Sequence, residues 1–312
     1  MTDKNYKPIS ITPNFYQIGT REFPAYLSMG EEGMVIEGGT GPTTKIIIEQ
    51  IEQLNIDQKR IKYIALTHTH PDHIGALPYL KHFWPHAKVV ASPAAAETLC
   101  KEEMLKPFLY VDRSIGEIMK AKGEIEELPP APEEYNFEVD WAVEEGDKID
   151  LGSGIVWTVY HTPGHSPCHM SLFEEKERTL VIGDATGFYV PEKDVFWPNY
   201  FQSLEEYCNT IRKLATLPAQ RGALSHNCVI EGNVGQHFEK ALKATERYHT
   251  EIMERIGAGE DVKEIARKKA EWVDSLTDIQ PFEVMLNLSK LLIKCSQRDA
   301  DKPNLFSPTQ KT

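Results

Sequence analysis

Residues 67–75 read Thr-His-Thr-His-Pro-Asp-His-Ile-Gly and place three histidines and one aspartate within six positions, namely His68, His70, Asp72 and His73. An apolar strand-like run, residues 61–66, comes before this stretch, and a helix-like run, residues 74–83, follows it. Neutral imidazole and carboxylate are the usual protein ligands of zinc and other first-row metals. The stretch is therefore expected to form a metal-binding loop between a buried strand and a helix.

The spacing within this loop indicates how metal ions would be shared. In an extended segment, side chains two residues apart point to the same side, so His68 and His70 can bind one ion. Pro71 then redirects the chain, which lets Asp72 and His73 face a second ion. A solvated histidine-rich loop is the alternative, but such loops rarely lie between a buried strand and a helix start. The loop therefore predicts half of a dinuclear metal site.

Three further polar residues follow apolar strand-like runs and are candidates for the remaining ligands. His165 lies in His-Thr-Pro-Gly-His, where a Pro-Gly turn can aim a side chain. Asp184 ends the run at residues 179–182, and an acidic group there is costly to bury without a cation or hydrogen-bond donors. His226 follows a short strand at residues 223–225. The alternative for each is a turn residue with satisfied hydrogen bonds; His169 is interpreted as structural, or as a residue that orients a ligand.

Strand-like and helix-like segments alternate through the first 91 residues, which indicates layered α/β structure. Residues 93–138 are typical of an inserted helical pair with a Pro-rich loop, and more strands follow up to residue 182. We predict one α/β domain over residues 1–236, a helical region over residues 237–295 that covers the site, and a disordered tail over residues 296–312.

In this order along the chain, His68-Thr-His70-Pro-Asp72-His73, Gly-His165, Gly-Asp184 and Ser-His226 resemble the motifs of the metallo-β-lactamase fold hydrolases. The resemblance covers about residues 8–236 and implies an αββα sandwich, here with a helical insertion and a helical C-terminal extension. It also implies that His68, His70 and His165 bind one metal ion, that Asp72, His73 and His226 bind the other, and that Asp184 bridges them.

Within this family, the chain is most similar to the quinolone-signal response proteins, which are aminobenzoylacetyl-CoA thioesterases. The shared features are Glu37-Gly-Gly, a Leu-Pro-Tyr-Leu segment after the metal-binding loop, and a helical C-terminal part. This likeness is one of layout and short motifs, so it implies no particular substrate.

Composition limits the partners. The 312-residue chain has a net charge of −13, which argues against a nucleic-acid or anionic-membrane surface. It contains no apolar run of about 18 residues that could span a bilayer, and its first residues lack the apolar core of a signal peptide. Its five cysteines are scattered, so no disulfide framework is expected. We expect a cytoplasmic protein; a homo-oligomer is compatible with the sequence.

The expected chemistry is hydrolysis by a metal-bound hydroxide, because a divalent ion can lower the pKa of bound water to about 7. Asp72 would be a ligand that also orients the attacking water. Aromatic residues after Asp184 are candidates either for the core or for an apolar acyl pocket, among them Phe188, Tyr189, Trp197 and Tyr200. The expected substrate is a small molecule, an ester or thioester with an apolar acyl group, such as an acyl-CoA. The two divalent metal ions would be zinc or iron, with manganese as a third option, because all three accept these ligands.

Other functions remain open. A nucleic-acid processing hydrolase would need clustered Lys and Arg, which the sequence lacks. A persulfide dioxygenase would use a single iron and consume oxygen with glutathione persulfide. The related flavodiiron pattern has Glu where His70 stands and is disfavoured. A signalling protein that acts through partner binding could keep the site, and catalytically inactive variants would then still complement a null strain.

Overall fold

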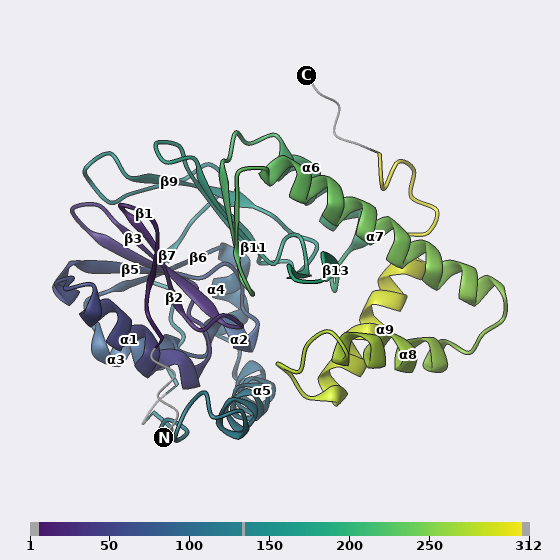
Figure 1. Ribbon diagram of the computed structural model, residues 1–312, viewed down its shortest axis with the longest axis horizontal. Helices are drawn as coiled ribbons and strands as arrows, with labels where there is room; N and C mark the ends of the chain where they lie inside the picture. Colours follow the sequence, from purple (N-terminus) through teal and green to yellow (C-terminus); the bar gives the residue numbers. More distant parts are fainter. Residues whose placement is uncertain (1–5, 133–134, 308–312) are drawn as a thin grey trace. The chain divides into compact units, whose positions relative to one another are not determined.

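The computed structural model describes residues 6–132 and 135–307. The chain forms two compact units, and Figure 1 labels many of their helices and strands. Unit 1 comprises Met1–His161 and Leu172–Glu177, and unit 2 comprises Thr162–Ser171 and Arg178–Thr312.

Unit 1 contains a seven-stranded sheet whose strands follow chain order. The first four strands pair antiparallel, and the later ones join in parallel. The first two strands form a hairpin, because Pro13 and Asn14 form a turn between them. The strands are β1 Ile9–Thr12, β2 Phe15–Gly19, β3 Pro24–Met29, β4 Gly33–Ile36, β5 Ile61–Ala65, β6 Lys88–Ala91 and β7 Trp141–Ala142.

Helices connect the parallel strands of unit 1, since parallel neighbours cannot be joined by a tight hairpin. The two helices α4 and α5 lie in the stretch predicted as an insertion. The unit also contains the antiparallel pair β8 Lys148–Asp150 and β9 Val156–His161. The helices are η1 Gly41–Thr43, α1 Thr44–Gln53, η2 Gln58–Arg60, α2 Pro71–Ile74, α3 Leu77–Phe83, α4 Pro93–Leu99 and α5 Glu102–Ala121.

The register of β4 and β5 determines what lies at one edge of this sheet. The two strands are parallel, with Ile36 opposite Ala65. Parallel neighbours end at the same edge, so Glu37, directly after β4, lies beside the residues that follow β5. His68 and His70 follow β5, as expected, whereas Asp72 and His73 lie in the short helix α2 and not in a loop. The helix expected over residues 74–83 begins at Leu77.

The second sheet has the strand order β15-β14-β11-β10-β9-β8, and β10, Met170–Glu174, has residues in both units. In unit 2, β11 Thr179–Gly183 and β14 Arg221–Leu224 are parallel, with Val181 opposite Ala223. Asp184 and His226 follow these two strands, so the same rule places them at one edge. The other strands of unit 2 are β15 Val229–Glu231, antiparallel to β14, and the hairpin of β12 Phe188–Val190 and β13 Val195–Trp197.

Amphipathic helices make up the rest of unit 2, drawn in green and yellow in Figure 1: α6 Leu204–Ala215, α7 Val234–Gly257, α8 Val262–Asp274 and α9 Phe282–Arg298. Helix α7 begins at Val234, where the Asn233 side chain accepts from Gln236 N; the division expected after residue 236 stays a prediction. Within the described part of the chain, no helix combines the length and apolarity needed to cross a membrane.

The structure also departs from the disordered tail predicted over residues 296–312. Helix α9 continues to Arg298, and Asp299 and Leu305 are buried. The reason is that the Asp299 carboxylate accepts hydrogen bonds from backbone amides of α6, and Leu305 O accepts one from Arg212. Residues 308–312 lie outside the described residues.

Candidate metal centre

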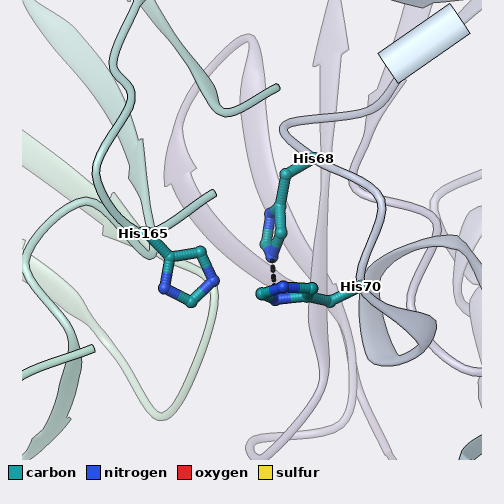
Figure 2. Close-up of side chains that lie close together, drawn as sticks. All are labelled: His68, His70 and His165. Atoms are coloured by element: carbon teal, nitrogen blue, oxygen red, sulfur yellow. Dashed lines mark hydrogen bonds between the residues drawn. The ribbon is translucent and has the colours of Figure 1, made fainter. Parts of the chain in front are cut away.

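The loop after β5 brings its four predicted ligands together, and we call His68, His70, Asp72 and His73 the first ligand cluster. Nε2 of His68 and Nδ1 of His70 are 3.0 Å apart, and Figure 2 draws the hydrogen bond between the two rings as a dashed line. The ring centroids of His68 and His73 are 4.0 Å apart, and Asp72 Oδ2 is 3.6 Å from His73 Nε2. His70 is half-buried and the other three are buried.

Hydrogen bonds behind the first cluster determine which ring nitrogens carry protons. Thr67 donates its hydroxyl proton to Glu37 Oε1 at 2.7 Å, so the Thr67 oxygen accepts from His68 Nδ1 at 2.9 Å. The other carboxylate oxygen, Glu37 Oε2, accepts from His73 Nδ1 at 2.9 Å. In both histidines the proton is on Nδ1, which leaves Nε2 unprotonated, the form in which imidazole binds metals.

Glu37 is a supporting residue whose role the sequence analysis missed. It is 1% exposed and has a φ of 73°, a conformation uncommon for a residue with a side chain. The chain bends closely here: Gly38 N donates to His73 O at 2.6 Å, and a Cβ on Gly38 would lie 2.7 Å from that oxygen. An acidic residue directly after a buried strand was the signal available, the same one that singled out Asp184.

Helix α5 places a buried carboxyl group, that of Asp112, against the same part of unit 1. Asp112 Oδ1 accepts from Gly41 N at 2.8 Å, and a Cβ on Gly75 would lie 2.4 Å from that oxygen. The pKa of Asp112 is raised from 3.8 to about 6. Burial is the largest cause and the charge of Asp72 adds to it, whereas the hydrogen bond from Gly41 acts in the opposite direction.

The raised pKa of Asp112 predicts a pH-dependent effect of Asp112→Asn. The folded protein binds this proton more tightly than the unfolded chain, so the carboxyl's stabilising contribution is complete below pH 3.8 and is lost as the pH rises through about 6. The unfolding free energy of the variant minus that of wild type should therefore increase by about 1–3 kcal/mol from pH 4 to pH 8. Urea denaturation of chelator-treated protein at both pH values measures this. Exposed Asp57→Asn is the control, and an equal effect of D112N at both pH values would contradict the prediction.

In unit 2, His165, Asp184 and His226 form the second ligand cluster. Asp184 Oδ2 is 3.4 Å from His165 Nε2, and Asp184 Oδ1 is 3.7 Å from His226 Nε2. All three residues are buried. The carboxylate thus presents one oxygen to each of two imidazoles, an arrangement suited to a ligand shared between two cations.

The backbone before His165 requires glycine. Gly164 has a φ of 121°, and a Cβ there would lie 2.2 Å from Tyr207 N. The His165 ring, drawn in Figure 2, donates from Nδ1 to Asn199 O at 2.9 Å. Since a carbonyl oxygen only accepts, Nε2 is again the unprotonated nitrogen.

His169 supports Asp184 through the backbone. Asp184 N donates to His169 Nε2 at 3.0 Å, so Nδ1 carries the proton and donates to Thr162 Oγ1 at 2.7 Å. Thr162 Oγ1 lies 3.1 Å from Ser171 Oγ, which donates to Ile182 O at 3.1 Å. This buried chain of hydrogen bonds fixes the backbone at Asp184, so both the structural role expected for His169 and the role of orienting a ligand stay predictions.

The predicted substrate residues differ in their surroundings. The Phe188 ring lies 5.1 Å from the His226 ring, centroid to centroid, and the Tyr189 ring lies 4.4 Å from that of Phe196. Trp197 packs on Phe201, whose ring is 5.3 Å from that of His165. Tyr200 is fully buried, with its hydroxyl 2.8 Å from Ser296 Oγ. Aromatic rings therefore border the second cluster, while Tyr200 belongs to the core of unit 2.

The family model described as the Metallo-beta-lactamase superfamily matches residues 27–226, and the chain belongs to this superfamily. Probable metallo-hydrolase YflN of Bacillus subtilis is 27% identical over 213 residues, which cover 64% of this chain and 76% of that protein. An atrochrysone carboxyl ACP thioesterase of Aspergillus fumigatus is 24% identical over 229 residues, 73% of this chain and 57% of that protein. A solved metallo-beta-lactamase from Cronobacter sakazakii has a TM-score of 0.57 at 20% identity, and the match covers 78% of this chain and 96% of that one.

These matches confirm the predicted family and the αββα fold class. The donor chemistry of the two clusters fits divalent cations. Every predicted ligand is an imidazole or a carboxylate, and in three of the histidines Nδ1 is hydrogen-bonded to an oxygen acceptor. Such a hydrogen bond from the second ring nitrogen is typical of metal-binding histidines.

Proposed function

We propose that this protein is a dinuclear metal hydrolase that acts on an ester or thioester with an apolar acyl group. In this proposal the two clusters together hold two divalent ions. His68, His70 and His165 would bind one ion, and Asp72, His73 and His226 would bind the other. Asp184 would be shared between the two ions.

The geometry of Asp184 is the observation that carries the proposal. Its two oxygens face His165 and His226 at 3.4 and 3.7 Å, and its backbone is held by His169. A buried carboxylate is expensive without a compensating positive charge. Two bound cations would supply that charge.

Bound divalent ions would lower the pKa of water and polarise the scissile carbonyl. The remaining work falls to side chains of this chain. Asp72, beside His73, would orient the attacking water by accepting a hydrogen bond from it. Glu37 and Thr67 keep His68 and His73 in the tautomer that a ligand needs.

Three observations favour an apolar ester or thioester over a phosphodiester. Phe188 and Phe201 lie against the candidate ligands His226 and His165. The net charge of −13 disfavours a nucleic-acid substrate. One relative is described as an acyl carrier thioesterase, which supports this substrate class.

A substrate panel tests the proposal. Protein reconstituted separately with zinc, iron and manganese is assayed on acyl-CoA thioesters of increasing chain length, aryl esters, lactones and a phosphodiester. We expect thioester or ester hydrolysis that increases with the apolar surface of the acyl group, stops in chelator and returns with metal. Metal-loaded protein that cleaves only the phosphodiester, or that consumes oxygen with glutathione persulfide, would overturn this assignment.

A further inference from the structure

The segment between β13 and α6 contacts the turn that carries His165, and we call residues 199–203 the support loop. Asn199 O accepts from His165 Nδ1 at 2.9 Å, and Gln202 Oε1 accepts from Gly164 N at 3.0 Å. Gln202 N and Ser203 N both donate to Gly164 O at 3.1 Å. The direction of the His165 ring therefore follows the conformation of the support loop.

The end of α9 binds this loop and the start of α6. Ser296 Oγ lies 2.8 Å from Tyr200 OH, and Arg298 Nη2 donates to Gln202 O at 2.9 Å. Asp299 Oδ2 accepts from Leu204 N at 2.9 Å and from Glu205 N at 3.2 Å. These contacts join segments that are about 95 residues apart in the chain.

Asp299 serves as an N-terminal cap of α6 that is supplied by another helix. The first amides of a helix are unpaired within it and its dipole favours a negative charge there. Ser203 Oγ accepts from Glu206 N at 3.2 Å, and Asp299 accepts from the two preceding amides. Asp299 is 3% exposed. Burial would raise its pKa, but hydrogen bonds from Arg298 and from the α6 amides lower it below its ordinary value.

We propose that Asp299 is a positioning residue for the metal ligand His165. By holding the start of α6 and, with Arg298, the support loop, it fixes the direction of His165 Nε2. This inference rests on the proposed function, because it takes His165 to be a ligand. Loss of the Asp299 carboxylate should weaken binding of the ion that His165 holds while leaving the rest of the centre intact.

The test compares Asp299→Ala with a matched control, Asp261→Ala. Asp261 caps α8 by accepting from Lys263 N at 2.7 Å and from Glu264 N at 3.4 Å, so its removal deletes the same kind of bond elsewhere in unit 2. Full-length proteins are stripped of metal and titrated with Co²⁺, with affinities measured by chelator competition and geometry by visible absorption. We expect D299A to bind one Co²⁺ about tenfold more weakly, with a changed spectrum, and D261A to match wild type. D299N should recover part of the affinity, because its amide oxygen can still accept from α6.

The titration tests the positioning role of Asp299 and the proposed function separately. It is carried out at a temperature where circular dichroism shows every variant folded. If D299A does not fold, R298A, which removes the contact to Gln202 O, should show the same weakening. Wild-type Co²⁺ affinity in the folded variant, or equal weakening in D261A, would overturn the positioning role. Wild-type protein that binds no Co²⁺ would instead overturn the proposed function itself.

Discussion

Replacement of His68 by alanine should reduce hydrolysis by a factor of about 1000 or more and weaken metal binding together with it. His68 is buried, its Nε2 is 3.0 Å from His70 Nδ1, and its Nδ1 is tied to Thr67. Alanine removes one of the three nitrogens proposed for one ion. The site would then bind this ion more weakly, and the transition state of hydrolysis would lose the stabilisation that the ion supplies.

The measurement is kcat/KM on the best thioester or ester from the panel, with metal content determined on the same sample. His161→Ala is the matched control, because the His161 ring is hydrogen-bonded to Val143 O and belongs to neither ligand cluster. It should retain most of the activity and both ions. Full activity in H68A would end the proposal, whereas equal losses in H68A and H161A would point to general destabilisation.

The second large effect is expected for Glu37→Gln, which should weaken metal binding about 10- to 100-fold. The carboxylate accepts two hydrogen bonds at once, from Thr67 Oγ1 and from His73 Nδ1. Glutamine has the same size but a single acceptor oxygen, and its amide group would present protons to a second donor. One histidine would therefore lose the contact that fixes its tautomer.

Zn²⁺ affinity, measured by competition with a chelator, reports this effect independently of substrate. Glu177→Gln is the matched control: Glu177 also lies in unit 1 and accepts from a threonine hydroxyl, that of Thr12, and from Asn14 Nδ2. We expect E177Q to bind Zn²⁺ as wild type does. If E37Q retains wild-type affinity at both ions, Glu37 does not orient the ligands.

The parts of the site that follow from local sequence could be predicted. The four residues of the first ligand cluster lie next to one another in the chain, between a strand and a helix start and beside a proline, so their order and spacing could be predicted from the sequence. Asp184 and His226 could be named because each follows a short apolar strand. The family match confirms the fold class that these motifs imply. The number and identity of the ions, and the division of the chain after residue 236, stay predictions.

The supporting residues could not be found in this way, because their partners are distant in sequence. Glu37 meets Thr67 and His73 only through the parallel pairing of β4 with β5. Likewise, the polar composition of the C-terminal stretch predicts disorder. The structure shows instead that Asp299 accepts hydrogen bonds from backbone amides about 95 residues earlier in the chain. Such contacts come from strand order and helix packing, which hydrophobic periodicity does not specify.

The most direct test of the dinuclear centre is the metal content of the purified, reconstituted wild-type protein beside Asp184→Asn, measured by mass spectrometry with protein concentration on the same sample. The account predicts two divalent ions per wild-type chain and fewer in D184N, since the amide gives up the shared negative charge. A folded wild-type protein that holds less than one ion per chain after reconstitution would contradict it.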